Sequence, residues 1–298
     1  MENKNFKIGF IGQGWIGKNL ANNFEKRDFD VVRYGLEAEY IKNKGSIKDC
    51  DITFIAVPTP TTTTGFNFDA IKISLALIGK GKIAVIKSTI LPGTTNILQK
   101  EFSEIIVLHS PEFLREATAE NDTDYPERNL VGYSEESMKN IEASKKVLSV
   151  LPKANYSKSM LATQTELIKY SGNCFLFTKV IFFNLMQDLA TSLEVDFEEI
   201  REAVGEDNRI GHGHTKVLHA SGHDENKKEK RGAGGHCFIK DMEALRSFTH
   251  EKLNDEGYDS LIESFVKINN NLLIKSGKDL DLLRGVYGED LTIKEFKK

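Results

Sequence analysis

The chain contains few cysteines, with three among 298 residues, at the widely spaced positions Cys50, Cys174 and Cys237. An odd number of widely spaced cysteines argues against a disulfide framework and is typical of a protein of the reducing cytoplasm. The sequence also lacks an excess of charge, because its net charge is −4 with 28% charged residues. This balance gives no indication of a nucleic-acid or membrane-surface partner.

Targeting signals are lacking as well. The charged first residues lead straight into a strand-like segment and do not form a signal peptide. No apolar run looks long enough to span a bilayer. A length of 298 residues is typical of about two domains with a substantial core, so we expect a two-domain protein of the cytoplasm.

A glycine-rich turn near the N-terminus predicts a nucleotide-binding domain. An apolar strand ends in Gly12-Gln13-Gly14-Trp15-Ile16-Gly17, and a helix and a second strand are expected to follow. This order is typical of a dinucleotide-binding unit. In such a unit Gly12 makes the tight turn and Gly14 lets the backbone approach a pyrophosphate at the helix N-terminus, while Gly17 permits close packing of helix and strand.

The predicted fold class is α/β, with a Rossmann-like, doubly wound parallel sheet over residues 1–155 and an all-helical domain with a long central helix over residues 156–298. The further strands expected in the sheet are 30–34, 51–57, 83–86, 105–108 and 129–131. Three of them end in the polar or turn-forming clusters Pro58-Thr59-Pro60, Lys87-Ser88-Thr89 and Ser110-Pro111-Glu112. Ligands of open parallel sheets bind at the carboxyl ends of strands, so these clusters are expected to line the binding cleft.

The cofactor is predicted to be NAD, with NADP as an open alternative. The second strand of an NAD-binding unit usually ends in an acidic residue that binds the adenosine ribose. Gly35 stands at that position here, and Glu37 comes two residues later. Arg33 is a candidate contact for the 2′-phosphate of NADP, although its side chain can point the wrong way along the strand.

In the second half, residues 159–194 predict one long helix, or two with a bend. Glu166, Lys169 and Asn173 recur on one face of it, either as functional groups or as a solvated stripe. Further helices are expected over 197–204, 239–251 and 258–276. The histidine-rich segment 211–235 is expected to be a mobile, solvated loop without a metal site, in which Lys230 or Arg231 contacts phosphate.

The segment Gly234-Gly235-His236-Cys237-Phe238-Ile239-Lys240-Asp241 is the most informative stretch of the chain. It places a cysteine after a glycine turn, with a lysine and a carboxylate one helical turn further on. A thiol at a helix N-terminus beside a cation loses its proton easily and can act as a nucleophile. The alternative is that Cys237 is a small buried apolar residue after a loop.

Taken together, these segments resemble the UDP-glucose/GDP-mannose dehydrogenase family. The motifs that carry the resemblance are, in chain order, the glycine motif 12–17, Val57-Pro58-Thr59-Pro60, Lys87-Ser88-Thr89-Ile90-Leu91-Pro92-Gly93-Thr94, Ser110-Pro111-Glu112-Phe113-Leu114-Arg115-Glu116, Glu166-Leu167-Ile168-Lys169 with Asn173, Arg209-Ile210-Gly211 and the Cys237 segment. The resemblance implies oxidation of the primary alcohol of a nucleotide sugar to a carboxylate by two NAD, through a thiohemiacetal and a thioester on Cys237.

The resemblance also implies roles for matching residues. The implied catalytic residues are Cys237, Lys169, Asn173, Asp241, Glu116 and Thr89. The implied substrate-binding residues are Glu112, Phe113, Leu114, Arg115, Lys240 and Arg231. The implied cofactor-binding residues are Gly12, Gln13, Gly14, Trp15, Ile16, Gly17, Val57, Pro58, Thr59, Thr89 and Glu116.

The sequence departs from the family pattern at several points. Family members continue into a further nucleotide-binding domain, for which residues 279–298 are too short. Ile239 replaces a proline and Gly35 replaces the ribose-binding acid. The resemblance makes the helix over 258–276 the expected contact of a homodimer. Two other functions stay open, a two-electron β-hydroxyacid-type dehydrogenase and a non-catalytic binding or assembly protein.

Overall fold

The computed structural model describes residues 6–115, 118–221 and 228–292. The chain divides into two compact units, the first formed by Met1–Thr59 and Phe68–Lys169 and the second by Pro60–Asn67 and Tyr170–Lys298. The division expected between residues 155 and 156 stays a prediction.

The first unit contains a seven-stranded sheet in the order β2-β1-β3-β6-β7-β8-β9. Its strands are β1 (Lys7–Ile11), β2 (Asp30–Tyr34), β3 (Ile52–Ile55), β6 (Ile83–Ile86), β7 (Ile106–His109), β8 (Arg128–Tyr133) and β9 (Tyr156–Leu161). The Rossmann-like α/β class is confirmed, with one correction: β8 runs antiparallel to β7 and parallel to β9. The sheet is therefore mixed at this edge.

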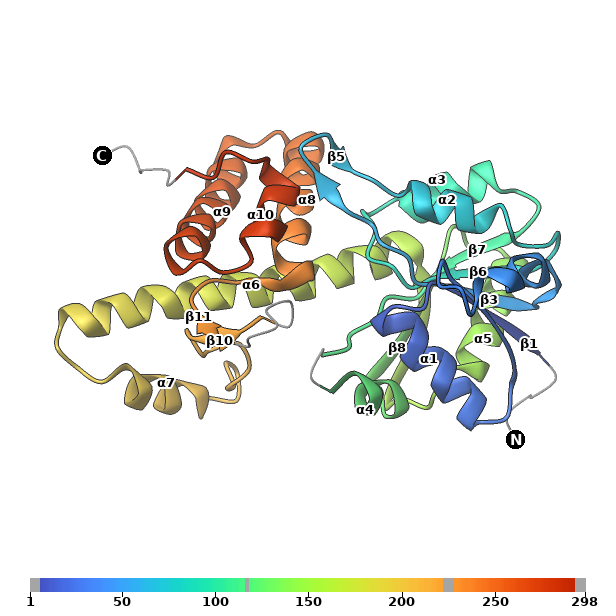
Figure 1. The fold of residues 1–298 in the computed structure, drawn as a ribbon, viewed down its shortest axis with the longest axis horizontal. Coiled ribbons are helices and arrows are strands. Elements are labelled where there is room, and N and C mark those ends of the chain that lie inside the picture. Colours follow the sequence, from blue (N-terminus) through green and yellow to red (C-terminus); the bar gives the residue numbers. More distant parts are fainter. Residues whose placement is uncertain (1–5, 116–117, 222–227, 293–298) are drawn as a thin grey trace. The chain divides into compact units, whose positions relative to one another are not determined.

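Helices cover both faces of this sheet. They are α1 (Trp15–Lys26), the 3-10 helix η1 (Ile41–Asp49), α2 (Asp69–Leu75), α3 (Thr94–Glu101), α4 (Ala119–Asp124) and α5 (Met138–Val150). Figure 1 shows α1, α4 and α5 on one side of the sheet and α2 and α3 on the other. Three phenylalanines centre the core between α1 and the sheet: the ring of Phe10 lies 5.3 Å from that of Phe54, and the Phe24 ring lies 5.4 Å from both.

The long helix α6 (Ala162–Ser192) runs through both units without a break. It begins later than residue 159, because residues 159–161 extend β9 along the sheet edge. The expectation that no apolar run is long enough to span a membrane was wrong, since α6 meets that criterion by length and composition. The side chains of Tyr170, Phe177 and Val180 are buried, so α6 is a core helix of the fold.

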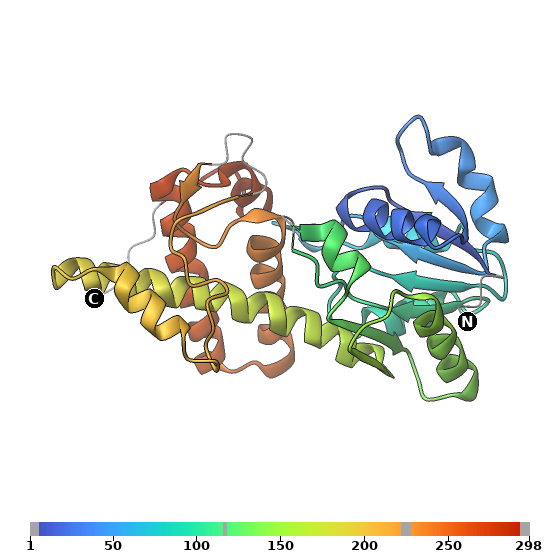
Figure 2. The ribbon, with the colours of Figure 1, turned by 90° about the horizontal axis from the view of Figure 1, so that it is seen from below.

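The second unit also contains α7 (Phe197–Gly205), α8 (Gly235–Leu253), α9 (Glu256–Ser276) and α10 (Leu280–Tyr287). Helices α8, α9 and α10 pack against one another (Figure 2). A hairpin of β4 (Thr61–Thr62) and β5 (Gly65–Phe66) packs on α8, and its first strand also packs on α10. The prediction of an all-helical second domain therefore missed short strands.

The segment 211–235 is not a solvated loop within its described part. Strand β10 (His219–Ala220) pairs with β11 (Glu229–Lys230), and the side chains of Thr215, Val217 and Ala233 are buried. The paired strands and the buried side chains fix the conformation of this segment within the second unit. Residues 222–227, which include His223, lie outside the described residues.

Candidate active site

The glycine motif forms a cradle at the N-terminus of α1. Gly12 has a positive φ of 89°, and its N–H donates to the carbonyl of Tyr34 at 2.9 Å. A methyl group at Gly17 would lie 1.9 Å from the Gly12 carbonyl oxygen, whereas one at Gly14 would meet nothing within 4 Å. The turn is thus tight on one side and open at Gly14. No side chain caps α1, so its first N–H groups suit the pyrophosphate of a dinucleotide.

Two of the predicted strand-end clusters are linked by hydrogen bonds. The Ser88 hydroxyl accepts from the N–H of Val57 at 3.0 Å and donates to the Val57 carbonyl at 2.7 Å. The Thr59 hydroxyl donates to the Thr89 carbonyl at 2.7 Å, and both threonines are buried. Because Ile55 of β3 pairs with Ile86 of β6, these bonds hold the loops after two neighbouring strands together at one edge of the sheet.

Lys169 of α6 and Glu112 form a buried ion pair. The Lys169 ammonium donates to the Glu112 carboxylate at 2.9 Å and to the Glu112 carbonyl at 2.7 Å. Their side chains are 5% and 10% exposed, which corrects the alternative of a solvated stripe. The other Glu112 oxygen accepts from the N–H of Leu114 at 2.7 Å, so one carboxylate orders both the lysine and the following loop.

The neighbouring predicted substrate-binding residues have other partners. The Arg115 guanidinium pairs with Asp122 at 2.6 Å, and this pairing holds the pKa of the Asp122 carboxyl well below its usual range. The Arg128 guanidinium lies over the Phe113 ring at 3.8 Å. Glu116 lies outside the described residues. Binding of substrate by Phe113, Leu114 and Arg115 stays a prediction.

Glu166, one turn before Lys169, is fully buried and caps α3. Its carboxylate accepts from the N–H of Gly93 at 2.6 Å, and from the N–H and hydroxyl of Thr95 at 2.8 and 2.6 Å. Burial raises the pKa of Glu166, which the hydrogen bonds from Thr95 and Gly93 oppose. The carboxylate therefore ties α6 to the loop that carries Thr89.

Cys237 lies in the first turn of α8, because this helix begins at Gly235 rather than at residue 239 as predicted. Its side chain is exposed, which removes the alternative of a buried apolar residue. Asp241, one turn further, is buried and accepts from the Asn173 amide at 2.6 Å. Lys240 pairs with the same carboxylate at 2.5 Å. An exposed thiol thus stands one turn from a buried carboxylate that binds two donors.

The predicted phosphate contacts, Lys230 and Arg231, bind other parts of the second unit. The Arg231 guanidinium donates to the Asn184 side chain at 2.8 Å and pairs with Asp188 at 2.8 Å, both on α6. The Lys230 ammonium donates to the Gly277 carbonyl at 2.7 Å. These contacts hold the segment in front of Cys237, and a contact with phosphate stays a prediction.

Sequence reasoning gave no role to His109, Lys278 or Asp279, and it placed Lys87 only in a strand-end cluster. Lys87 and His109 are buried beneath the strand ends, and burial lowers the pKa of Lys87 to about 8 and that of His109 to about 3. Lys278 and Asp279 contact the glycine turn before Cys237. No spacing rule links residues more than 40 positions apart, so only the fold reveals this contact.

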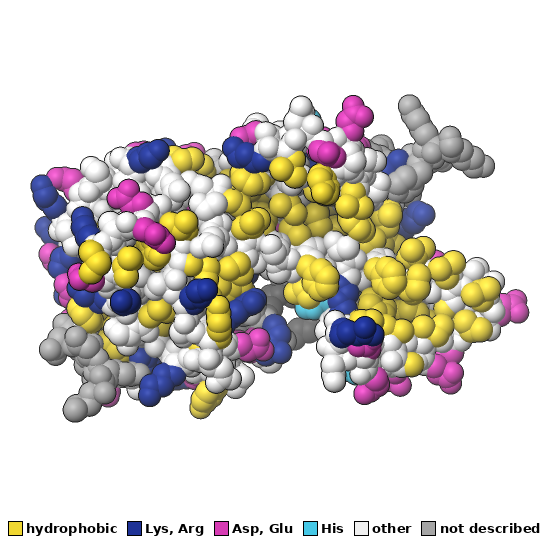
Figure 3. Space-filling view, turned by 180° about the vertical axis from the view of Figure 1, so that it is seen from behind, with side chains coloured by type: hydrophobic (Ala, Val, Ile, Leu, Met, Phe, Trp, Pro, Cys, Tyr) yellow, Lys and Arg dark blue, Asp and Glu magenta, His cyan; other side chains and the backbone are white. Residues whose placement is uncertain are grey.

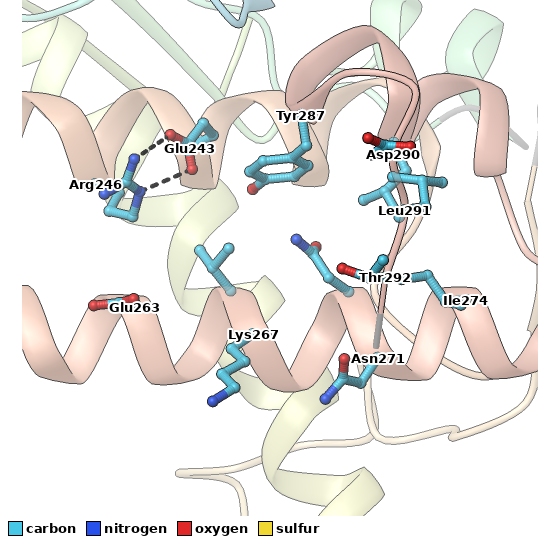
Figure 4. Close-up of a pocket in the computed structure, with 13 residues that line it drawn as sticks. Glu243, Arg246, Glu263, Lys267, Asn271, Ile274, Tyr287, Asp290, Leu291 and Thr292 are labelled. Atoms are coloured by element: carbon cyan, nitrogen blue, oxygen red, sulfur yellow. Dashed lines mark hydrogen bonds and ion pairs between the residues drawn. The ribbon is translucent and has the colours of Figure 1, made fainter. Parts of the chain in front are cut away.

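A cavity of about 250 Å³ lies within the second unit, bordered by α8, α9 and α10 (Figure 4). A bidentate pair between Glu243 and Arg246, at 2.6 and 2.9 Å, forms part of its wall. Burial raises the pKa of Tyr287, which also lines the cavity. None of the predicted site residues lines it. In residues 6–115, 118–221 and 228–292 no group of three His, Cys, Asp or Glu side chains is placed to hold a metal ion.

Comparison with known proteins decides the family. Residues 36–149 match the NAD-binding domain of the UDP-glucose/GDP-mannose dehydrogenase family, and residues 163–271 match its central domain. The chain belongs to this family. The UDP-glucose 6-dehydrogenase of Rickettsia prowazekii is 30% identical over 281 residues, which make up 89% of this chain and 62% of the relative. The chain thus spans less than two thirds of that dehydrogenase.

Solved structures agree with this membership. A UDP-glucose dehydrogenase from Pyrobaculum islandicum matches with a TM-score of 0.73 and 25% identity, over 89% of this chain and 68% of the other. A 3-hydroxyisobutyrate dehydrogenase from Mycobacterium tuberculosis matches with a TM-score of 0.68 over 94% of this chain and 98% of the other, at 14% identity. The second likeness shows the fold alone.

Proposed function

We propose that the chain is a cytoplasmic NAD-dependent dehydrogenase that oxidises the primary alcohol of a nucleotide sugar, of the UDP-glucose type, to a carboxylate. The observation that carries this proposal is the exposed Cys237 thiol in the first turn of α8, one turn before the buried Asp241 that binds Asn173. A thiol suits a double oxidation, because it converts an aldehyde into a covalent adduct that can lose a second hydride.

The proposed reaction consists of two oxidations and one hydrolysis. NAD supplies the hydride acceptor for both oxidations, and the glycine cradle with Val57, Pro58 and Thr59 would hold it. Loss of a proton and a hydride from the alcohol would give an aldehyde. The Cys237 sulfur would bond to its carbon while the aldehyde oxygen takes up a proton, which gives a thiohemiacetal. Loss of a second hydride and of the hydroxyl proton would give a thioester, and water would then cleave the C–S bond to release the carboxylate, a proton and the thiol.

Five polar residues would stabilise charge, move protons or position water during these steps. The Lys169 ammonium and Asn173 amide, one turn apart on α6, are donors for the oxyanions that form during the oxidations. A preorganised donor of this kind is typically worth about 3–4 kcal/mol. Asp241 would accept protons, and Glu116 and Thr89 are proposed to assist deacylation and to position water.

A second candidate is a two-electron oxidation of a smaller β-hydroxyacid. It is supported by the ordered Lys169 ammonium, held by Glu112 at 2.9 Å, because a preorganised donor beside a developing oxyanion serves either oxidation. Under this alternative Lys169 and Asn173 keep their roles, whereas Cys237 is dispensable.

Counting reduced cofactor separates the candidates. The wild type and Cys237→Ser would be incubated with excess NAD and limiting UDP-glucose, GDP-mannose or 3-hydroxyisobutyrate. The proposed function requires two NADH per sugar with the wild type and loss of this ratio in Cys237→Ser. One NADH per hydroxyacid with both proteins supports the second candidate. Cys174→Ser is the matched control, because that thiol is buried.

We also propose that the chain forms a homodimer. One face of α6 carries the exposed apolar side chains Phe175, Phe182, Leu185 and Leu189, and the exposed Leu193 follows directly after the helix. Hydrophobic side chains gather on the face of the second unit seen in Figure 3. A contiguous exposed apolar stripe is typical of a protein–protein interface. Helix α9, which contains the segment 258–276 that the family resemblance predicts to be a dimer contact, exposes Tyr258 and Leu261 and is the other proposed contact.

A further inference from the structure

The carboxylate of Glu37 occupies the space beside Gly35, where the ribose-binding acid of a dinucleotide site is expected. A methyl group at Gly35 would lie 2.1 Å from Glu37 Oε2. Gly35 has no positive φ, so its backbone alone does not require glycine. The missing side chain instead leaves room for the end of the Glu37 side chain, which folds back along the loop.

This position borders the glycine cradle. Strand β2 ends at Tyr34, whose carbonyl accepts from the N–H of Gly12, so the end of β2 lies beside the start of the cradle. The same methyl group at Gly35 would lie 3.3 Å from Cγ of Gln13, the second residue of the motif. The Glu37 carboxylate therefore lies next to the loop expected to bind the pyrophosphate.

Arg33, the candidate contact for a 2′-phosphate, is directed elsewhere. Its guanidinium donates to the Glu25 carboxylate at 2.8 and 2.6 Å and to the Asn22 side chain at 2.7 Å, both on α1. Its side chain is only 11% exposed. A bidentate ion pair of this kind is among the stronger side-chain interactions, so the pair disfavours release of Arg33 to a phosphate.

We infer that Glu37 replaces the missing acid at residue 35, binds the adenosine ribose hydroxyls and selects NAD over NADP. This inference rests on the proposed use of a nicotinamide dinucleotide. A carboxylate accepts hydrogen bonds from both ribose hydroxyls, whereas it repels the 2′-phosphate of NADP. Gly35 then acts through Glu37, because any side chain at residue 35 displaces the carboxylate.

Binding of NADH and NADPH without substrate tests the inference. Trp15 is the only tryptophan of the chain and is 61% exposed at the start of α1, so its fluorescence reports on the cradle. Glu37→Ala is expected to raise the Kd for NADH about ten-fold or more, as for loss of a charged hydrogen-bond acceptor. It is also expected to reduce the ratio of the Kd for NADPH to the Kd for NADH. Glu39→Ala, which removes an exposed acid from the same loop, is expected to change neither Kd.

Two further variants test the role of Gly35. Gly35→Ala is expected to weaken NADH binding like Glu37→Ala, and the double variant Gly35→Asp/Glu37→Ala is expected to restore it. Unaltered NADH binding by Glu37→Ala, or an equal loss in Glu39→Ala, would overturn the inference. Wild-type protein that binds neither dinucleotide would overturn it together with the proposed cofactor. Absence of sugar oxidation with intact, Glu37-dependent NADH binding would count against the proposed reaction alone.

Discussion

The carboxylate of Asp279 accepts a hydrogen bond from the N–H of Gly235 at 2.7 Å, across 44 positions of the chain. The preceding residue, Lys278, is also buried, and its ammonium donates to the carbonyl of Gly232 at 2.9 Å. A methyl group at Gly234 would lie 2.1 Å from Asp279 Oδ2. The two side chains thus clasp the glycine turn that leads into α8 and Cys237.

Loss of this clasp should destabilise the turn. Asp279→Ala leaves the Gly235 N–H without its acceptor, and we expect a loss of about 1–3 kcal/mol in the free energy of unfolding. Asp279→Asn keeps an acceptor oxygen and tolerates the positive φ of 49°, so it should lose less. Urea denaturation measures both. The rate of Cys237 alkylation, measured in the background Cys50→Ser/Cys174→Ser, should change more in Asp279→Ala than in Asp279→Asn. Equal stability of the three proteins would contradict the prediction.

Glu166 should stabilise the first unit through the cap of α3. Glu166→Ala removes the acceptor of three hydrogen bonds from Gly93 and Thr95. We expect the free energy of unfolding to fall by at least about 1–3 kcal/mol, because buried neutral donors are left without their acceptor. Thr95→Val removes only the hydroxyl donor and should cost about 1–2 kcal/mol. In a double-mutant cycle by chemical denaturation, additive losses would show that the two side chains do not interact.

His109 should make the stability depend on pH. It is fully buried, and burial lowers its pKa from about 6.5 to about 3. Because the unfolded chain takes up a proton below pH 6.5 and the folded chain does not, stability is retained above pH 6.5 and falls as the pH drops toward 3. Between pH 7 and pH 5, His109 should lower the free energy of unfolding by about 2 kcal/mol.

The variant His109→Gln should lose less stability than the wild type over the same pH interval, when free energies of unfolding are compared at each pH. Thr165→Val is the matched control, because it removes the hydroxyl 2.8 Å from His109 Nδ1 but keeps the imidazole. It should shift stability by a constant amount and leave the pH dependence in place. Parallel curves for the wild type and His109→Gln would show that His109 does not cause the dependence.

The proposed dimer predicts a change in mass. Leu185→Glu/Leu189→Glu places two charges on the exposed apolar face of α6 and should convert a dimer to a monomer at micromolar concentrations, because burial of unpaired charge opposes association. Leu253→Glu is the control, since that leucine is 58% exposed at the end of α8. Light scattering after size exclusion measures the mass. A wild-type monomer would contradict the proposal.

Local patterns were sufficient to predict much of the first unit. The strand bounds at Asp30–Tyr34 and Ile83–Ile86 were correct because short apolar runs between turn residues define such strands well. Strand β9 was missed because its edge position leaves it largely exposed and its sequence polar. The strand propensity of these residues therefore gave no reason to end a strand before the helix α6, and the helix was predicted from residue 159.

The candidate site could be proposed from the sequence only where motifs carry its residues. Motifs predicted Lys169, Asn173 and Cys237 as site residues, which stays a prediction, whereas the partners that hold their side chains depend on packing. The acceptor role of Asp279 and the folded-back position of Glu37 depend on distances that no spacing rule contains. In the sequence, Gly35 is only a missing acidic residue at the ribose-binding position. In the structure, its lack of a side chain leaves space for the carboxylate of Glu37.

Lys169 should be needed for turnover but not for cofactor binding. Its ammonium is held by Glu112 at 2.9 Å, which orders it before substrate arrives. Lys169→Met removes the charge at similar length and should lower kcat by about 10²–10³-fold, as for loss of an oxyanion donor. NADH binding, measured by Trp15 fluorescence, should be unchanged.

Glu112→Gln tests whether the ion pair orders Lys169 or only balances its charge. It keeps a carbonyl acceptor for the ammonium, so a positioning role predicts a smaller loss of kcat than in Lys169→Met. The double variant should then lose no more than Lys169→Met alone, since Glu112 acts through the lysine. A double variant whose loss of kcat is the product of the two single losses would mean that Glu112 does not act through Lys169, and would overturn the positioning role.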